Sequence, residues 1–134
     1  SDVPALDCAY KLQEYKGTPR RKQSPGKATW PGRKQVWRRY GADGTMAGDV
    51  LSTADDAQVG EPLIAPVMEE GRRLRPQPTL AEARDHAARQ LKRLPAALRR
   101  LEIAAYPVIV ADPLKRLAAE TDRRLAARQG KRPE

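Results

Sequence analysis

Residues 34–51, KQVWRRYGADGTMAGDVL, decide the fold of the first half of the chain. The part 34–40 includes valine, tryptophan and tyrosine, residues that favour a β-strand. Gly-Ala-Asp-Gly follows at 41–44, and an Asp-Gly pair is typical of a tight turn because its glycine tolerates positive φ. Residues 45–51 then provide a returning strand. The stretch therefore predicts an antiparallel β-hairpin.

The regions on either side of this hairpin also favour β structure. Upstream, residues 8–15 (CAYKLQEY) alternate imperfectly between apolar and polar, as a strand does. Repeated glycines and prolines predict an irregular loop over 17–32. Downstream, residues 62–68 (PLIAPVM) form a short apolar piece that Pro66 places at the edge of a sheet. Residues 69–71 predict another turn.

A helix is predicted after Pro78. Thr79 and Glu82 have the spacing of a capping box, in which each side chain accepts a hydrogen bond from the backbone N–H of the other residue. Apolar residues then recur at intervals of three and four, which is the period of an amphipathic helix. This stripe consists of Leu80, Ala83, Ala87, Leu91 and Leu94.

Two further helical segments follow. Residues 96–101 predict a short helix, and 106–110 (YPVIV) an extended segment because β-branched residues follow Pro107. Asp112 is a suitable N-cap for a third helix, with a proline at its first position. The tail 130–134 is expected to fray.

The order of elements predicts an α+β fold. We expect N-terminal antiparallel strands with a hairpin and a basic loop (residues 16–34) over 1–75, followed by a helical cap of about three helices over 79–129. The whole chain, 1–134, is interpreted as a single region of a longer protein.

The charge is concentrated in one segment. The chain carries 26 Lys and Arg against 17 Asp and Glu, a net charge of +9. Between Lys11 and Arg39 stand ten basic residues and one acid, Glu14, so this segment alone accounts for +9. Such a field attracts nucleotides, pyrophosphate or nucleic acid. A solvated basic loop without a partner is the alternative.

Composition argues against a complete, independently folding enzyme. Leu, Val and Ile together number 23 of 134 residues, and Phe is absent. The sequence begins with Ser1 rather than with an initiator Met, so we expect a piece of a longer chain. No apolar run approaches the roughly 18 residues of a membrane span. The single cysteine, Cys8, excludes an internal disulfide, and a reducing cytoplasm is the expected location.

Catalytic residues are not evident. His86 lies within the predicted helix, away from its apolar stripe, where a solvent-facing residue is expected. Cys8 is interpreted as a small buried apolar residue rather than an activated thiolate. Asp55 and Asp56 are suitable for binding a cation, but a turn explains them equally well. We therefore assign no catalytic and no metal-binding residue.

The basic loop, KGTPRRKQSPGKATWPGRK, has the chemistry of a phosphate site. It interleaves ammonium and guanidinium groups with hydroxyls, and its glycines let backbone N–H groups approach an anion. Charge-assisted hydrogen bonds to phosphate oxygens are strong. Trp30 and Trp37 have rings suited to stacking on a base, although packing in a core is the commoner fate of tryptophan.

The chain resembles the nicotinate phosphoribosyltransferase family over nearly its whole length. The motifs that carry the resemblance are Pro4-Ala5-Leu6, Tyr10-Lys11-Leu12, Pro19-Arg20, Lys22, Ser24, Gly26-Lys27, Thr29, Pro31-Gly32 and Lys34. The segments MAGDVLSTADD (46–56), LPAALRRLE (94–102) and YPVIVADPLKRLAAE (106–120) are similar to the C-terminal end of that family.

The resemblance implies an ATP-dependent transfer in NAD biosynthesis, in which nicotinate and phosphoribosyl pyrophosphate give nicotinate mononucleotide and pyrophosphate. It implies ATP and Mg²⁺ as cofactors and a homodimer in the full-length protein. Lys22 and Lys27 are expected near the nucleotide or pyrophosphate, with Arg20 and Thr29 as further candidates. The family's phosphorylated histidine belongs to a barrel domain upstream of Ser1, so the chain alone is expected to be inactive.

Two other interpretations remain open at this point. A small nucleic-acid-binding module would use the same loop as an electrostatic clamp. Six aromatic residues, with no Phe among them, offer little for base stacking, so nucleic acid is not the expected partner. A purely structural cap with a solvated loop is the third possibility.

Overall fold

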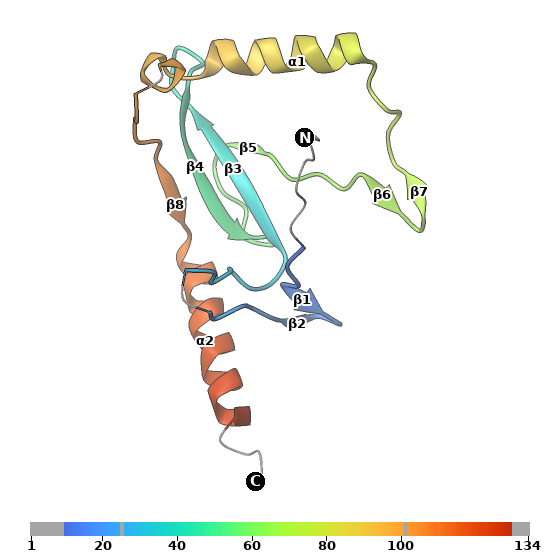
Figure 1. Ribbon diagram of the computed structural model, residues 1–134, viewed down its shortest axis with the longest axis vertical. Helices are drawn as coiled ribbons and strands as arrows, with labels where there is room; N and C mark the ends of the chain where they lie inside the picture. Colours follow the sequence, from blue (N-terminus) through green and yellow to red (C-terminus); the bar gives the residue numbers. More distant parts are fainter. Residues whose placement is uncertain (1–9, 25, 101, 130–134) are drawn as a thin grey trace, which may run out of the picture. The chain divides into compact units, whose positions relative to one another are not determined.

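The computed structural model describes residues 10–24, 26–100 and 102–129 (Figure 1). The chain divides into two compact units. Unit 1 combines residues 1–33 with 112–134, and unit 2 comprises 34–111. The elements are those of an α+β fold, as the sequence predicts.

Unit 2 is built on a four-stranded sheet in the order β5-β3-β4-β8 (Figure 1). Strands β3 (Lys34–Tyr40) and β4 (Met46–Thr53) form the predicted antiparallel hairpin. Their pairing runs from Lys34↔Thr53 to Arg39↔Gly48 and shifts by a bulge before Tyr40↔Met46. The hairpin prediction is confirmed.

Local hydrogen bonds close the turn between these strands. The N–H of Gly41 donates to the carbonyl oxygen of Thr45 at 2.8 Å. Gly44 adopts φ +77°, which its lack of a Cβ permits. The Asp43 carboxylate accepts from the backbone N–H and the hydroxyl of Thr45, at 3.0 and 2.7 Å. The hydroxyl bond is the main reason that the pKa of Asp43 lies below its usual value.

The last strand makes the sheet mixed. β8 (Val108–Val110) pairs in parallel with β4, with Val50 opposite Ile109. The sequence predicted an extended segment here but not its place in the sheet. Parallel pairing needs a long connection, and residues 54–107, which include a helix, provide it.

The apolar piece over 62–68 reaches the edge of the sheet, as predicted, but only its first residue belongs to an edge strand of that sheet. β5 (Glu61–Pro62) pairs with β3, whereas β6 (Met68–Glu69) pairs with β7 (Arg72–Arg73) in a separate hairpin. Prolines within the segment offer no N–H for a continuous ladder. The predicted turn is confirmed, with positive φ at Glu70 and Gly71.

Helix α1 (Leu80–Arg93) begins as predicted. The N–H of Glu82 donates to the Thr79 hydroxyl at 3.2 Å, and the N–H of Thr79 donates to the Glu82 carboxylate at 2.7 Å. The apolar stripe of α1 is not buried, since Leu80 is 68% and Leu91 61% exposed.

The predicted cap of three helices is only partly matched. Residues 96–99 form a single 3₁₀ turn, η1 (Ala96–Arg99), preceded by Pro95, and Leu101 lies outside the described residues. The third helix, α2 (Asp112–Gln129), starts at the predicted residue but belongs to unit 1 rather than to the unit that contains α1.

A charged cluster joins the sheet of unit 2 to the segment before β8. Arg38 donates to both carboxylate oxygens of Asp49, from Nε at 2.9 Å and from Nη2 at 2.8 Å. The Tyr106 hydroxyl donates to Asp49 at 3.0 Å. Hydrogen bonding from Arg38 lowers the pKa of Asp49, while burial and the bond to Asp49 raise the pKa of Tyr106.

Trp37 links strands β3 and β4 through its side chain. Its Nε1 donates to the hydroxyl of Ser52 at 3.0 Å, and Ser52 is fully buried.

At the turn of the hairpin, the guanidinium of Arg93 stacks on the ring of Tyr40 at 3.6 Å, and its Nε donates to the carbonyl oxygen of Gly44. Arg93 thereby ties the end of α1 to the hairpin.

Unit 1 contains a short hairpin and α2. β1 (Glu14–Tyr15) and β2 (Thr18–Pro19) are joined by Lys16 and Gly17, both at positive φ as a type I′ turn requires. The predicted strand over 8–15 is therefore wrong except for its last two residues, because residues 10–13 find no strand partner; residues 8 and 9 lie outside the described part.

One face of α2 is buried. Leu114, Ala118 and Thr121 are almost inaccessible, and the Thr121 hydroxyl donates to the carbonyl oxygen of Leu117 at 2.7 Å. Across the described residues, neither helix has the length and apolar character needed to cross a lipid bilayer.

Candidate phosphate-binding loop

The central part of the basic loop, residues 20–32, starts and ends at one carbonyl group. The N–H groups of Arg20 and Gly32 both donate to the carbonyl oxygen of Gln13, at 2.9 and 2.7 Å. Closing a loop at a single acceptor fixes both of its ends, as in a compact Ω-loop. Gly32 packs against α2, and a Cβ built on it would lie 2.9 Å from Cδ2 of Leu117.

Two internal contacts shape the loop between these ends. Lys22 and Thr29 are tied together, because the Lys22 N–H donates to the Thr29 hydroxyl at 3.0 Å and the Thr29 N–H donates to the Lys22 carbonyl oxygen at 3.1 Å. The N–H of Lys27 donates to the carbonyl oxygen of Ser24 at 3.0 Å, which closes a tight turn with Gly26 at φ +67°.

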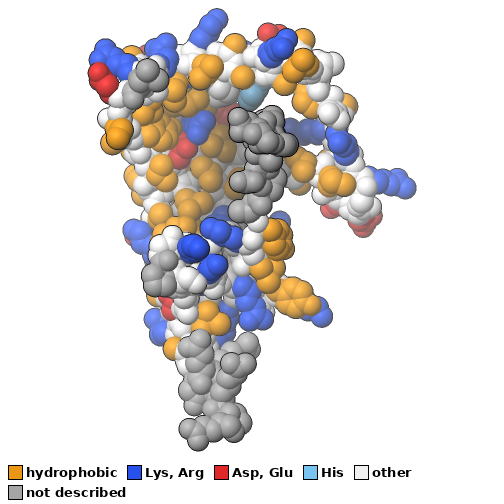
Figure 2. Space-filling view, viewed as in Figure 1, with side chains coloured by type: hydrophobic (Ala, Val, Ile, Leu, Met, Phe, Trp, Pro, Cys, Tyr) orange, Lys and Arg blue, Asp and Glu red, His pale blue; other side chains and the backbone are white. Residues whose placement is uncertain are grey.

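The side chains of the four predicted site residues fall into two groups. Lys22 and Lys27 are exposed, and neither ammonium has a hydrogen bond or ion pair to any residue that the structure describes. Arg20 is half-buried, and Thr29 is only 8% exposed. Figure 2 shows Lys and Arg side chains over the face of unit 1 that it presents. Both lysines are thus available to an anion, while the Thr29 oxygen already serves the backbone of Lys22.

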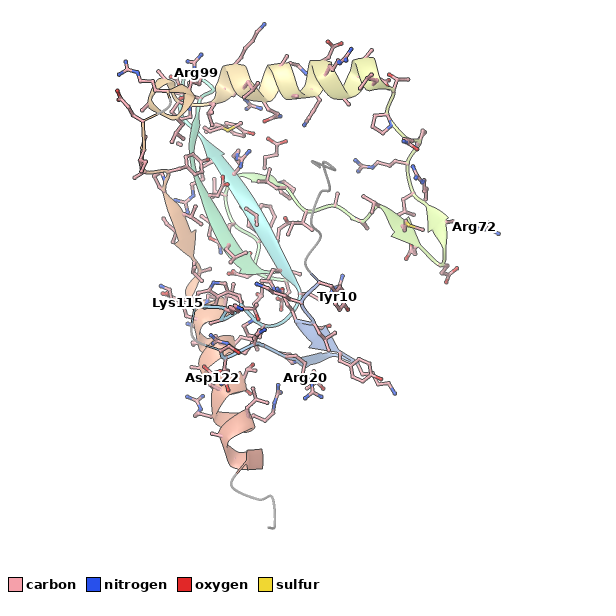
Figure 3. The ribbon with its side chains drawn as sticks, viewed as in Figure 1. Tyr10, Arg20, Arg72, Arg99, Lys115 and Asp122 are labelled. Carbon is pink, nitrogen blue, oxygen red and sulfur yellow. The ribbon has the colours of Figure 1, made fainter. Side chains whose placement is uncertain are left out.

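Side-chain hydrogen bonds hold both the loop and the hairpin that precedes it to α2. Asp122 of α2 accepts from Nη1 of Arg21 at 3.1 Å and from Nε2 of Gln23 at 2.7 Å. Arg124 of α2 donates to the carbonyl oxygen of Pro19. Figure 3 labels Asp122 on the helix and Arg20 in the segment that follows β2.

These anchoring residues were not predicted from the sequence. Asp122 lies 101 positions after Arg21, and no local motif connects them. The only available signal was an acid within an otherwise basic end of α2, which is too common to indicate a contact. Gln13 acts through its main chain, which carries no sequence signature.

The other residues considered for chemistry have ordinary roles. His86 is exposed on α1, as predicted. The hydroxyl of Thr53 lowers the pKa of Asp55, and the N–H of Asp56 donates to the carbonyl oxygen of Thr53 at 3.2 Å, which indicates a turn. No three His, Cys, Asp or Glu side chains gather into a possible metal site within residues 10–24, 26–100 and 102–129. Cys8 lies outside these ranges.

Comparison with known proteins connects this chain and its fold to one family. Residues 56–118 match the profile of the nicotinate phosphoribosyltransferase C-terminal domain. Nicotinate phosphoribosyltransferase pncB2 of Mycobacterium tuberculosis is 48% identical over 114 residues, which cover 83% of this chain and 24% of that protein. The Bos taurus nicotinate phosphoribosyltransferase is 36% identical over 140 residues, covering 85% and 26%.

A solved structure agrees with these sequence matches. The crystal structure of human nicotinic acid phosphoribosyltransferase superposes with a TM-score of 0.73 at 31% identity, over 84% of this chain and 26% of that one. The α+β fold is therefore that of a phosphoribosyltransferase C-terminal region. More narrowly, the chain belongs to the nicotinate phosphoribosyltransferase family, and it spans about a quarter of the length of the relatives it matches.

Proposed function

We propose that this chain forms the C-terminal region of an enzyme that makes nicotinate mononucleotide and pyrophosphate from nicotinate and phosphoribosyl pyrophosphate, coupled to ATP hydrolysis, in NAD biosynthesis. Within that enzyme, the basic loop binds phosphoryl oxygens of a substrate or product. The phosphate-binding role rests on the pair of exposed lysines, Lys22 and Lys27, in a loop whose backbone is held by hydrogen bonds.

The chemistry of the reaction supports this assignment. Departure of pyrophosphate concentrates negative charge on its oxygens, and fixed cationic donors stabilise that charge best when they need no rearrangement. Lys22 and Lys27 have ammonium groups without acidic partners among the described residues, so no existing ion pair has to break before a phosphate binds. Arg20 is half-buried and is proposed as a supporting donor.

The described residues suit the triphosphate of ATP better than they suit Mg²⁺. The free ammonium groups of the basic loop are appropriate donors for a triphosphate. Mg²⁺ prefers carboxylate oxygens and water, and the described residues gather no such set of ligands. We therefore assign Lys22 and Lys27 to phosphate oxygens and assign no Mg²⁺ ligand to this part of the chain.

The proposal is tested in the full-length enzyme by substituting the two lysines. We expect Lys22→Ala and Lys27→Ala each to lower kcat/KM about ten- to a hundredfold, the size expected for loss of a charge-assisted hydrogen bond. The KM of phosphoribosyl pyrophosphate or ATP should carry the change, and the KM of nicotinate should not. Lys92→Ala, which removes an equal charge from the exposed surface of α1, is the matched control.

Two results would contradict the proposal. Wild-type kinetics in both lysine variants would show that the loop is only solvated. Steeply salt-dependent binding of a single-stranded oligonucleotide by the chain, together with indifference to ATP and pyrophosphate, would instead favour a nucleic-acid-binding module.

A further inference from the structure

The residues on either side of Lys22 share one partner. Arg21 reaches Oδ2 of Asp122 at 3.1 Å, and Gln23 reaches Oδ1 of the same carboxylate at 2.7 Å. One carboxylate of α2 therefore holds the residue before Lys22 and the residue after it, while Lys22 itself is exposed between them.

The backbone of Lys22 is fixed as well. Its N–H and its carbonyl group are both hydrogen-bonded to Thr29, at 3.0 and 3.1 Å, and Thr29 is only 8% exposed. The main chain of Lys22 and the side chains of both neighbours are thus held, and its own side chain alone is left without a partner among the described residues. Because the main chain of Lys22 is already held, only its side chain has to become ordered when an anion binds.

Stability alone does not explain the contacts with Asp122. The side chain of Arg21 is 16% exposed but that of Asp122 is 41% exposed, and an ion pair with one partner open to water contributes little to the free energy of folding. In addition, Nε of Arg21 is buried without a hydrogen-bond partner in the described part of the chain, which is unfavourable. The geometry is better matched to orienting the loop than to stabilising it.

We propose that Asp122 is a positioning residue, which acts through Arg21 and Gln23 to hold the Lys22 ammonium toward a phosphoryl oxygen of the bound substrate. This inference rests on the phosphate-binding role proposed above for the basic loop. It adds a residue of the C-terminal helix to the determinants of phosphate affinity, 101 positions away from Arg21 in sequence.

The test is a double-mutant cycle in the full-length enzyme. Asp122→Asn keeps the size of the side chain and removes its charge, and Glu120→Gln removes the same charge from an exposed position two residues earlier on α2. The KM values of phosphoribosyl pyrophosphate, ATP and nicotinate and the melting temperature are measured for both, alone and combined with Lys22→Ala.

We expect Asp122→Asn to raise, by about tenfold, the KM of the same phosphate-bearing substrate that Lys22→Ala affects, a change typical of residues coupled in one network. Glu120→Gln should leave every KM unchanged, and the KM of nicotinate should stay constant throughout. In the Lys22→Ala background, Asp122→Asn should have less than about a twofold effect, because its action passes through that lysine.

The outcomes separate this inference from the proposed function. If neither Lys22→Ala nor Lys27→Ala changes a KM, the phosphate-binding role of the loop fails. If Lys27→Ala raises a KM but Lys22→Ala does not, the positioning role of Asp122 is overturned and the phosphate-binding role stands. If Lys22→Ala raises a KM but Asp122→Asn does not, or if the two effects are simply multiplicative, the positioning role of Asp122 is overturned and the phosphate-binding role stands.

A charge-reversed pair covers the case in which Asp122→Asn fails to fold. Exchanging the partners, Arg21→Asp with Asp122→Arg, restores opposite charges across the same contact, and Gln23 can turn its amide to accept a hydrogen bond instead of donating one. Recovery of the KM toward the wild-type value relative to each single reversal supports the inference. A swapped enzyme with wild-type melting temperature and a persistently raised KM contradicts it.

Discussion

Gly26 and Gly32 both adopt left-handed backbone conformations in the basic loop, at φ +67° and +77°, but their surroundings differ. A Cβ at Gly26 would meet nothing within 4 Å, whereas a Cβ at Gly32 would lie 2.9 Å from Cδ2 of Leu117. At the scale of single residues, the loop therefore depends on glycine for two separate reasons: backbone conformation at both positions and close packing against α2 at one.

This pair gives a matched prediction. Gly26→Ala should destabilise the chain by about 1 kcal/mol, the cost of placing a Cβ in the left-handed region. Gly32→Ala should cost about 2–3 kcal/mol, because the methyl group must also displace Leu117. Urea unfolding of the chain measures both changes. Equal losses at the two positions would show that the contact with Leu117 is relieved without cost.

At the scale of elements, Asp49 links strands β4 and β3 to the segment that leads into β8. It lies on β4, accepts two hydrogen bonds from Arg38 on β3, and accepts a third from Tyr106 before β8. Its side chain is 12% exposed, so these bonds replace most of its contact with water. The cluster is a structural feature of unit 2 and has no part in the phosphate-binding proposal.

The lowered pKa of Asp49 predicts a dependence of stability on pH. Because the folded-state pKa lies below the unfolded value of about 3.9, the contribution of Asp49 is present above that pH and is lost as the pH falls through the folded-state pKa. Asp49→Asn should cost about 2–3 kcal/mol at pH 7, and Tyr106→Phe about 1 kcal/mol.

Urea unfolding at pH 7 and at progressively lower pH checks this prediction. The difference in unfolding free energy between the wild-type chain and Asp49→Asn should shrink once the wild-type carboxylate is protonated. A penalty of the same size on both sides of the transition would mean that the amide disturbs packing rather than charge.

At the scale of the whole molecule, the described residues include the proposed phosphate-binding loop, and we assign no catalytic residue among them. His86 is exposed on α1, and the chain spans about a quarter of the length of its relatives. The apolar stripe of α1 is largely uncovered, with Leu80 and Leu91 both more than half exposed. A free-standing enzyme would normally bury such a stripe.

We therefore predict that the 134-residue polypeptide alone does not turn over nicotinate, phosphoribosyl pyrophosphate and ATP. Formation of nicotinate mononucleotide is measured in parallel with the full-length enzyme at equal molar concentration. Robust product formation by the isolated polypeptide would show that its own residues suffice for catalysis, and it would contradict the division of labour proposed here.

Much of the fold follows from residues close together in sequence. The Asp-Gly turn, the strands on either side of it and the capping box of α1 each depend on interactions within a few residues, and all three predictions are confirmed. The strand predicted over 8–15 failed because an extended propensity does not supply a pairing partner. The parallel pairing of β8 with β4 was not predicted because it joins segments separated by a helix.

The candidate site was also predicted from the sequence only in part. Composition by itself determined that the excess positive charge lies between Lys11 and Arg39. The resemblance of the motifs in this segment to one family then made Lys22 and Lys27 the leading candidates for binding phosphate. Only the tertiary structure decided how the basic loop is held, by Gln13 at its ends and by Asp122 beside Lys22. The physical reason is range: backbone preferences and charge density act between near neighbours, whereas a hydrogen bond between residues 101 positions apart exists only once the chain has folded.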